Sequence, residues 1–492
     1  MIKQIYNPYL PSWEYVPDGE PHVFGDRVYL YGSHDAANAD RFCVNDYTVW
    51  SAPTKDLSDW TCHGVSYRKE QDPRSQPGKL VDFYAPDCVQ GPDGRYYLYY
   101  VAMGPNVKNF GPISVAVSHL PSGPFDYLGD VQYPDGRPVL KYLTNDPAVL
   151  NDNGRIWLYY GWGLGRDFRS KALAPIYNFV QSRLFERPVS EIRKTKPSIL
   201  SCAALELEED MLTVKSGPKA VLDSKTTAPK YSELYDHAFY EAPSVRKFEN
   251  LYYLVYSSGE NNELAYATSE FPDRDFRFRG VIISGSDIGY QGNTVRRYPA
   301  GTIHGGIEDI GGKYYVFYHR CTNNSDFSRQ ACAEPITIEA DGTIRQVEIT
   351  SCGLNGRALA GKGKYPASIC CQLYGKKMPP KLSVRLREKY RCVVEESGIQ
   401  IIHGIDNGTV IGYKYFNFDG ETILRITYRG NADGVLEVRA DGKADPIASV
   451  PVRTSGTWTA AETKVPFKKS VSALWLTYHG KGKLDLSEIE FI

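Results

Sequence analysis

The feature that most constrains the fold of this chain is a short aromatic strand pattern that recurs five times. The 492 residues include 37 tyrosines, many of them gathered in bursts that follow a Gly or Asn turn. The bursts are GDRVYLYGS (25–33), GRYYLYYVA (94–102), GRIWLYYGW (154–162), NLYYLVYSS (250–258) and GKYYVFYHR (312–320). Aromatic and β-branched runs of this length, bounded by turn residues, predict β-strands in hairpins and not helices.

Each burst keeps a fixed order with two other predicted strands. Ten to twelve residues before the central aromatic lies an acidic or polar residue that opens a short strand, in the segments 17–23, 85–90, 145–150, 240–245 and 303–309. A third strand follows at 48–60, 113–125, 264–276 and 329–344, and in the third repeat, where 163–235 carries longer insertions, we expect it at 202–214. Antiparallel strands repeated in this order predict an all-β fold, a five-bladed β-propeller.

The residues that open the first strands are candidates for a functional site. In a propeller the first strand of each blade lines the central axis, so residues at one repeat position form a ring. The ring predicted here is Asp18, Asp87, Asp146, Glu241 and His304. Four carboxylates and an imidazole raise each other's cost of burial, which indicates a functional centre. The plainer interpretation is that these are turn residues at the starts of blades, because Asp and Pro favour turns.

The sequence pattern changes after about residue 365. The stretch 354–381 runs into a Lys/Pro-rich joint, and short alternating strands follow at 408–418, 421–430, 434–442, 473–480 and 486–492. Such strands are typical of a β-sandwich. We therefore predict two domains, a propeller at 1–375 and a jelly-roll-like sandwich at 382–492.

Charge and hydropathy exclude several classes of partner. With 57 Lys+Arg against 58 Asp+Glu, the net charge of −1 offers no basic excess for nucleic acid or an anionic membrane. No run approaches the roughly 18 apolar residues of a membrane helix, and no apolar stretch follows the N-terminal Lys, so we expect a cytoplasmic protein. The ten cysteines show no CxxC pair and no zinc spacing, and are expected to be buried, reduced thiols. The sequence does not predict the oligomeric state.

Five segments, taken in order, resemble glycoside hydrolase family 43. They are NPYLP with PDGEPHV, YAPDCV, NDPAVL, YEAPSV followed by Lys247, and IHGGIEDIGGKYYVFYHR. The resemblance implies a five-bladed propeller that hydrolyses glycosidic bonds with inversion. It places Asp18 on the general base, Asp146 on the carboxylate that raises the pKa of the acid and orients it, and Glu241 on the general acid. Glu20 is a rival for the base, because Asp18-Gly19-Glu20-Pro21 replaces the family's Asp-Pro, but Asp18 has the better register with the other blades.

The resemblance also implies residues that surround the catalytic carboxylates. Calcium is expected near His304, mostly liganded by water, while the chemistry itself needs no cofactor. Arg320 and Arg329 are candidates for a bidentate clamp on sugar hydroxyls, with Arg329 preferred. The remaining candidates for substrate contact are Tyr84 and Trp162, which either stack on the sugar or pack between blades, Asp87, and His237, which either shapes the site or caps a loop.

The second domain is similar to carbohydrate-binding module family 6. The likeness lies in GYKYFNF, GVLEVRADG, GTWT and ALWLTYHGKGKLDL. Asp485 stands where such modules have an Asn, and Glu488 where a Trp is common. Tyr413 and Trp475 remain a possible sugar platform, but packing against the propeller is the preferred interpretation.

Together these observations predict an exo-acting, inverting glycosidase. Its expected substrates are short plant-derived oligosaccharides, from which it would release α-L-arabinofuranosyl or β-D-xylosyl residues. One alternative is a retaining furanosidase of the fructosidase type, with Asp18 as nucleophile and carboxyl groups about 5–5.5 Å apart instead of about 6.5–9.5 Å. The other is a propeller that binds sugars without catalysis.

Overall fold

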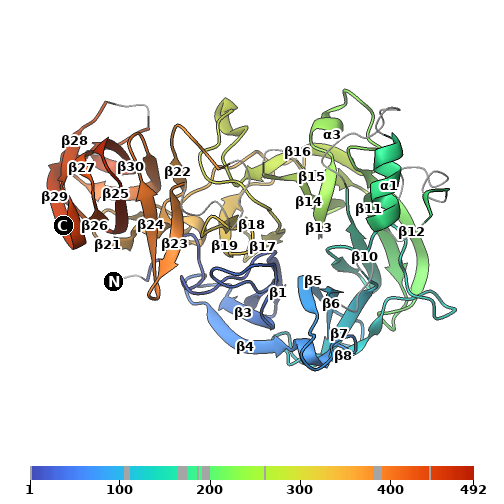
Figure 1. The fold of residues 1–492 in the computed structure, drawn as a ribbon. Helices are drawn as coiled ribbons and strands as arrows, with labels where there is room; N and C mark the ends of the chain where they lie inside the picture. Colours follow the sequence, from blue (N-terminus) through green and yellow to red (C-terminus); the bar gives the residue numbers. More distant parts are fainter. Residues whose placement is uncertain are drawn as a thin grey trace.

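A computed structural model of the chain describes residues 3–104, 111–163, 174–184, 188–190, 200–259, 262–379, 390–442 and 445–492. Within these ranges the secondary structure is nearly all strand, and the helices are short, such as α1 (Ala174–Leu184) and α3 (Glu233–Asp236). The fold is therefore all-β, as the sequence predicts (Figure 1).

The first two thirds of the chain form five small antiparallel sheets. The first is β1 (Glu20–Phe24), β2 (Arg27–Tyr31), β3 (Tyr47–Pro53) and β4 (Thr61–Tyr67), and the second is β5 (Asp82–Gln90), β6 (Tyr96–Met103), β7 (Ile113–Ser118) and β8 (Asp126–Asp130). The third is β9 (Ala148–Asp152), β10 (Arg155–Gly161), β11 (Ser201–Leu207) and β12 (Val214–Asp223). The fourth is β13 (Phe239–Phe248), β14 (Leu251–Ser258), β15 (Glu263–Ser269) and β16 (Arg277–Ser284), and the fifth is β17 (Ile307–Asp309), β18 (Tyr314–Cys321) and β19 (Arg329–Ile336). Each Tyr-rich burst is the second strand of its sheet, and β11 is the third strand expected at 202–214.

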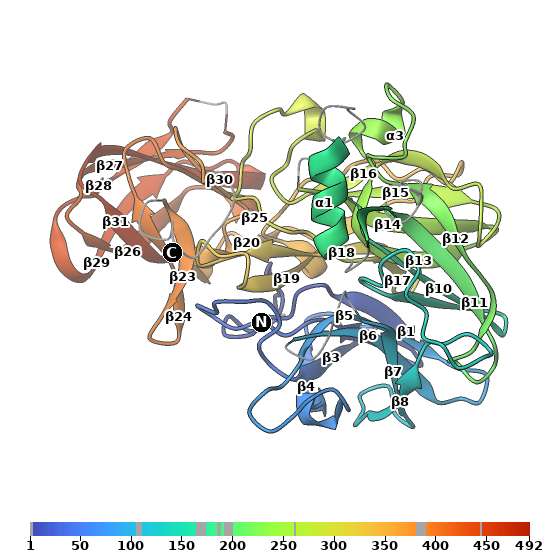
Figure 2. The same cartoon turned by 45° about the vertical axis from the view of Figure 1, so that its right-hand side comes forward.

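The first strands of the five sheets meet in a closed cycle. β1 contacts β5, β5 contacts β9, β9 contacts β13, β13 contacts β17, and β17 returns to β1 (Figures 1 and 2). Neighbouring sheets bury side chains between them, so each sheet is covered on both faces. This explains why the bursts are continuous aromatic runs and do not alternate with polar residues. In β6 and β10, for example, Tyr99, Tyr100, Tyr159 and Tyr160 are all fully buried.

The N-terminal segment completes the fifth sheet, which has three strands. Asn7 and Tyr9 run beside the edge strand β19: the Tyr9 N–H donates to the Ala331 carbonyl at 3.1 Å, and the Ala333 N–H donates to Asn7 Oδ1 at 3.1 Å. The Asn7 amide also donates to the Ala333 carbonyl at 3.0 Å. The start of the chain therefore covers an edge that would otherwise present unpaired backbone groups.

The C-terminal part forms two six-stranded sheets. Their strands are β20 (Leu359–Ala360), β21 (Gly363–Pro366), β22 (Gln372–Tyr374), β23 (Cys392–Glu396), β24 (Ile399–Ile405), β25 (Val410–Asp419), β26 (Thr422–Gly430), β27 (Asp433–Arg439), β28 (Ala448–Val452), β29 (Ser455–Val465), β30 (Lys469–Lys481) and β31 (Leu484–Phe491). One sheet has the order β20-β25-β30-β27-β28 with β22 beside β25, and the other β23-β24-β31-β26-β29 with β21 beside β31. The strands predicted from sequence appear as β25, β26, β27, β30 and β31. Residues 359–374, which precede the predicted boundary, contribute three further strands to these sheets.

The C-terminal sheets pack tightly on the fourth and fifth sheets. One hydrophobic cluster runs from Tyr253 and Val316 into both C-terminal sheets. Buried polar contacts cross the same boundary: Lys414 Nζ lies 2.8 Å from Glu348 and 3.3 Å from Asp287. The two parts therefore share one core.

The thiols match the sequence prediction. All ten cysteines are free, and nine of them are buried, with Cys62 exposed. Among the described residues, no helix has the length and apolar character needed to cross a bilayer.

Candidate active site

Four of the five predicted ring residues lie where the first strands begin, whereas Asp87 lies inside β5. Asp18 precedes β1 by two residues, Asp146 precedes β9 by two, His304 precedes β17 by three, and Glu241 is the third residue of β13. Asp18 and Asp146 have φ of 57° and 48°, and Ala242 after Glu241 has φ of 61°. This left-handed conformation costs about 1–2 kcal/mol for a residue other than glycine, and such strain gathers at functional sites.

Asp18 is a buried carboxylate surrounded by nitrogen atoms. Arg329 Nη1 donates to Asp18 Oδ1 at 2.7 Å, and His304 Nδ1 lies 3.8 Å from the same oxygen. The Asp18 backbone N–H donates to His319 Nδ1 at 3.2 Å. Burial alone would raise the pKa of Asp18, but the positive charges of Arg329 and His304 outweigh it and lower that pKa to about 2. Asp18 is therefore ionised at neutral pH.

Arg329 joins Asp18 to a second buried carboxylate. Its Nε and Nη2 donate to Asp35 at 2.7 and 3.1 Å, and the guanidinium lies 4.7 Å from the centre of the Phe42 ring. The sequence suggested a clamp on sugar hydroxyls, but this fork is already engaged by Asp35 and Asp18. Arg320 is engaged too, since its terminal nitrogens donate to the carbonyls of Cys370 and Ser368, both at 2.6 Å.

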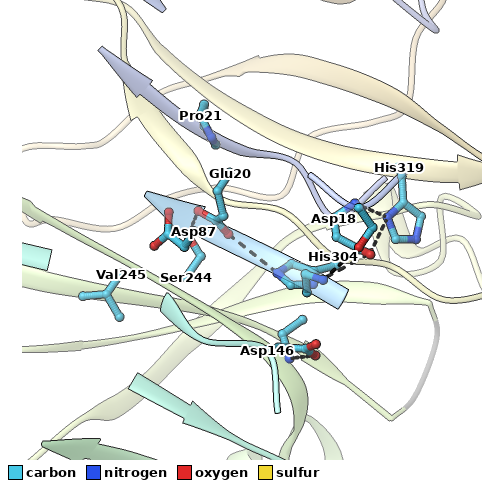
Figure 3. Close-up of polar contacts among 12 residues, drawn as sticks. Asp18, Glu20, Pro21, Asp87, Asp146, Ser244, Val245, His304 and His319 are labelled. Atoms are coloured by element: carbon cyan, nitrogen blue, oxygen red, sulfur yellow. Dashed lines mark hydrogen bonds and ion pairs between the residues drawn. The ribbon is translucent and has the colours of Figure 1, made fainter. Parts of the chain in front are cut away.

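Of the two histidines beside Asp18, one is charged at neutral pH and the other is not. His304 lies between carboxylates (Figure 3), with Nε2 at 3.7 Å from Glu20 Oε1. Burial would lower its pKa, but Glu20, Asp18 and Asp146 raise it to about 9. His319 has its pKa lowered to about 3 by burial, with Arg329 and His304 adding to the effect. His304 is thus an imidazolium at neutral pH, and His319 is a neutral ring whose Nε2 lies 3.1 Å from Thr302 Oγ1.

Asp146 lies directly beside Glu241. The N–H of Ala242 donates to Asp146 Oδ2 at 3.1 Å, so the carboxylate is held against the backbone next to Glu241. Burial is the main cause that raises the pKa of Asp146 to about 6; His304 opposes the rise and Asp18 adds to it. Glu241 is half-buried. The neighbouring Tyr240 ring lies 6.1 Å from Trp162, which places a tilted aromatic pair beside Glu241.

Glu20 and Asp87 belong to a deeper layer of the ring. Glu20 Oε2 accepts hydrogen bonds from Ser244 Oγ at 2.7 Å and Arg246 Nη2 at 3.2 Å. Asp87 is fully buried, with His22 Nε2 at 2.5 Å and the Val149 N–H donating at 2.7 Å. Both Asp87 oxygens are occupied by protein groups, so its position favours joining β5 to β9 over the predicted contact with substrate.

The donors near His304 fit a calcium ion only in part. Glu20, His22 and Asp87 bring ligand atoms within 4.8 Å of one another, but Arg246 Nη2 lies 3.2 Å from Glu20 and 3.3 Å from His22, so a positive charge already neutralises them. Among the described residues, Glu20 Oε1 is buried without a hydrogen-bond partner and faces His304. Glu20 Oε1 is thus one donor, and His304 Nε2 becomes a second only where the metal replaces the proton of the imidazolium; water would add the other oxygens that calcium prefers.

The remaining predicted residues lie on two sides of the ring. Tyr84 is half-buried beside Phe42, with ring centres 6.4 Å apart, and burial raises its pKa. His237 Nδ1 lies 2.5 Å from Glu263 Oε1, and its ring stacks on Phe278 at 5.1 Å. His237 lines a cavity of about 580 Å³ whose lining includes no ring residue. Tyr84 therefore lies on the side of the ring near Asp18, whereas His237 faces a cavity that no ring residue lines.

Comparison with known proteins identifies the family. A model of glycosyl hydrolases family 43 matches residues 12–183. A xylosidase/arabinosidase of Thermoclostridium stercorarium is 39% identical, over 99% of this chain and 98% of the relative. The chain belongs to glycosyl hydrolases family 43. This family 43 enzyme is a glycoside hydrolase with a propeller fold, and it acts on carbohydrate.

Solved structures of the same family agree with this fold. The GH43_1 enzyme from Xanthomonas citri, complexed with xylose, aligns with a TM-score of 0.52 and 25% identity over 72% of this chain and 96% of that one. A GH43 β-xylosidase/α-arabinofuranosidase from a compost microbial metagenome, with xylotriose and in a calcium-free form, aligns with a TM-score of 0.50 and 26% identity over 68% and 95%.

The sequence analysis missed three residues around Asp18 in this family 43 enzyme. Asp35 and Phe42 follow the first burst, in SHDAANADRFC, and His319 is part of the fifth burst. A buried polar residue inside an aromatic strand was the available signal for His319. Nothing in the repeat pattern indicated that Asp35 would pair with Arg329, which lies 294 residues away.

Proposed function

We propose that this enzyme is an exo-acting, inverting glycosidase that releases α-L-arabinofuranosyl or β-D-xylosyl residues from arabinoxylo-oligosaccharides. Asp18 acts as general base, Glu241 as general acid, and Asp146 controls the acid. The observation that carries the proposal is the contrast between two ring carboxylates: Asp18 has its pKa lowered to about 2, and Asp146 beside Glu241 has its pKa raised to about 6. Pairs of carboxyl groups held in different environments are typical of acid/base assignments in glycosidases.

On the base side, the chain keeps Asp18 charged and oriented. Arg329 holds one oxygen at 2.7 Å, and His304 adds a second positive charge. A water on the opposite face of the sugar from the leaving group would give a proton to Asp18 as its oxygen attacks the anomeric carbon. Glu20 fits this role less well, because its Oε2 is committed to Ser244 and Arg246.

On the acid side, Glu241 must hold a proton until the leaving oxygen takes it. A negative charge nearby raises the pKa of a carboxyl group. Asp146, fixed by the Ala242 N–H, brings that charge next to Glu241 once it ionises. The two groups therefore titrate as a coupled pair.

The sugar specificity is supported by the relatives and by aromatic side chains. The full-length relative is a xylosidase/arabinosidase, and one solved relative is a β-xylosidase/α-arabinofuranosidase with bound xylotriose. Trp162 with Tyr240 beside the acid, and Tyr84 with Phe42 beside the base, are apolar surfaces on which a sugar ring could stack.

The architecture completes the proposal. We infer that the five sheets are the blades of a five-bladed propeller, since their first strands contact one another in a closed cycle. We infer two domains, with the two six-stranded sheets as a sandwich similar to carbohydrate-binding module family 6, and residues 359–374 placed on the sandwich side by their strand pairing.

Packing is the role best supported for the proposed sandwich. Tyr413 is buried and its hydroxyl donates to the Ala367 carbonyl at 3.1 Å. Trp475 is half-buried and packs closely on Gly412, where an added Cβ atom would lie only 2.8 Å from the indole ring. Asp485 is paired with His403 at 2.9 Å and with Arg429 at 3.1 Å.

Two further inferences concern metal and location. Calcium near His304 would be held by Glu20 Oε1, water and the neutral His304 ring, and would supply positive charge at the ring in place of the proton that His304 releases. The cytoplasmic location stays a prediction, which fractionation of the source cells would test.

The test of this function is the configuration of the first-formed product. Time-resolved NMR with 4-nitrophenyl α-L-arabinofuranoside and 4-nitrophenyl β-D-xylopyranoside should show the inverted anomer, lost in Asp18→Asn and Glu241→Gln. Glu20→Gln is the matched carboxylate control for the base and should lose much less turnover than Asp18→Asn, with the inverted anomer still formed. A retained anomer would make Asp18 a nucleophile, and no turnover of either substrate by the parent enzyme would refute the proposal.

A further inference from the structure

The loop between β18 and β19 connects the C-terminal sheets to the catalytic base. Residues 322–328 end directly at Arg329, whose Nη1 donates to Asp18. The loop also carries Phe327, whose ring lies 4.6 Å from Phe42 in a perpendicular arrangement. Phe42 in turn covers the Arg329 guanidinium. The position of this loop therefore sets the position of the group that keeps Asp18 ionised.

The loop has a backbone shape that needs support from outside. Asn323 and Asn324 are consecutive residues with φ of 58° and 45°, and both are buried. Asn tolerates the left-handed region better than most residues, but it still carries a cost there. Two such residues in succession persist when surrounding contacts determine their conformation.

That support comes from the edge strand of a C-terminal sheet. β23 is the outermost strand in the order β23-β24-β31-β26-β29, so its outer side has backbone groups free to bond. The Asn323 N–H donates to the Val393 carbonyl at 2.6 Å, and the Glu395 N–H donates to Asn323 Oδ1 at 3.0 Å. Asn323 thus pairs with two alternate residues of β23 as a neighbouring strand would. Asn324 Nδ2 adds a bond to the Tyr390 carbonyl at 3.1 Å.

The same edge strand also contacts the segment that carries Asp18. Tyr15 donates its hydroxyl to Glu395 Oε2 at 3.0 Å. Burial raises the pKa of Tyr15 to about 12, so the phenol remains a donor at neutral pH. The Tyr15 carbonyl accepts the N–H of Asp35, the second partner of Arg329, at 2.9 Å. β23 therefore contacts both the segment that leads to Asp18, at Tyr15, and the loop that leads to Arg329, at Asn323.

We propose that β23 of the C-terminal sheets is a catalytic support, and that Asn323 and Glu395 are positioning residues that align Arg329 with Asp18. This rests on the proposed role of Asp18 as general base. The C-terminal part then contributes to the reaction through β23, and this role does not require it to bind sugar itself.

The test uses the full chain with three variants and a matched control. Asn323→Gly keeps the left-handed backbone accessible and removes the side-chain amide, which accepts from the Glu395 N–H and donates to Tyr15 and Thr322. Glu395→Ala removes the acceptor for Tyr15, and Glu395→Gln restores an oxygen at the same place. Glu396→Ala is the matched control, since Glu396 lies on the same strand but pairs with Arg429 in its own sheet, at 2.5 Å.

The expected result is a change in kcat and in its pH dependence. A misplacement of about 1 Å can cost about 100-fold in rate, so Asn323→Gly should lower kcat about 10- to 100-fold with KM little changed. The acidic limb of kcat/KM should move to higher pH, because a displaced Arg329 no longer lowers the pKa of Asp18. Glu395→Ala should show the same change more weakly, and Glu395→Gln should recover kcat.

The outcomes separate this inference from the proposed function. Parent-like kcat and pH profile in both Asn323→Gly and Glu395→Ala would overturn the positioning role while leaving the base assignment intact. Equal losses in Glu395→Ala and Glu396→Ala, without a shift of the acidic limb, would also overturn it. Turnover retained in Asp18→Asn would instead refute the base assignment itself.

Discussion

Replacing Arg329 by methionine should destabilise the enzyme in a pH-dependent way. Arg329 is 4% exposed and is the cation shared by Asp18 and Asp35, which are 5% and 1% exposed. The three hydrogen bonds from its guanidinium to them measure 2.7, 2.7 and 3.1 Å. Removing one partner of a buried ion pair costs about 3–5 kcal/mol, because the remaining charge stays buried without compensation. We expect Arg329→Met to lose about that much free energy of unfolding at neutral pH.

The sign of the pH dependence follows from the two carboxyl groups. In the parent enzyme the lowered pKa of Asp18, about 2, gives stability that is present above the ordinary value of 3.8 and is lost as the pH falls toward 2. In the variant, burial is no longer opposed by Arg329, so the pKa of Asp18 rises and Asp35 becomes harder to ionise. The free energy of unfolding of the variant is then lowest at high pH, where both carboxylates are charged, and it recovers as they take up protons. The stability gap between parent and variant should narrow as the pH falls below about 5.

Urea denaturation followed by tryptophan fluorescence, at several pH values, measures this gap. Arg320→Met is the matched control, because Arg320 is also buried but donates to the carbonyls of Cys370 and Ser368. Its loss should cost about 1.5–3 kcal/mol and be independent of pH. A loss below about 1 kcal/mol in Arg329→Met, or a gap of the same size at every pH, would refute this account of the ion pair.

Three further variants test the ring and the aromatic surface beside it. Asp146→Asn should move the alkaline limb of kcat to lower pH, because the negative charge proposed to keep the acid Glu241 protonated is gone; an unchanged limb in stopped assays across pH would contradict this role. His304→Gln should move the acidic limb of kcat/KM to higher pH, because the positive charge beside Asp18 is removed, whether it is the imidazolium with pKa about 9 or the calcium that replaces its proton. The same variant should also lose the calcium, about one ion per chain, that metal analysis would find in the parent before but not after chelation. Trp162→Ala should raise KM about 2- to 12-fold with a smaller effect on kcat, as expected for a lost stacking surface of about 0.5–1.5 kcal/mol, and a pure kcat effect would argue against stacking.

The sequence predicted the sheets well because the strand pattern is local. Each Tyr-rich burst follows its turn within a few residues, and the hairpin partner lies next to it in the chain, so periodicity alone indicated β2, β6, β10, β14 and β18. The strands β23 and β24 were not singled out, since 392–405 carries no aromatic burst.

The ring was predicted less evenly, and the reason lies in where each strand starts. Asp18 and Asp146 precede their strands, whereas Asp87 lies inside β5 and is buried. A shift of register between Tyr84 and Asp87 in β5, and others on both sides of Glu241 in β13, change which way the side chains point. Such bulges change the direction in which a side chain points, and the spacing of residues between repeats does not reveal them.

The partners of Asp18 depend on contacts across the whole chain. Arg329 and His319 come from the fifth sheet, about 300 residues after Asp18, and Asp35 comes from the loop after β2. The resemblance identified Arg329 but predicted that it binds sugar hydroxyls. Residue type alone does not show that carboxylates from another sheet already accept the hydrogen bonds of its guanidinium.

The N-terminal segment beside β19 has a consequence for how the chain folds during synthesis. Asn7 and Tyr9 complete the edge of the fifth sheet, yet Ala333 and Ala331 leave the ribosome more than 300 residues later. At about 5–20 residues per second, the first residues wait some 15–60 seconds for their partners. The earlier sheets can assemble in order as they emerge, but the cycle closes only when the start and the end of the ring meet. Closure is therefore a late event of high contact order, and weakening Asn7 should slow refolding more than a comparable change within the first hairpin.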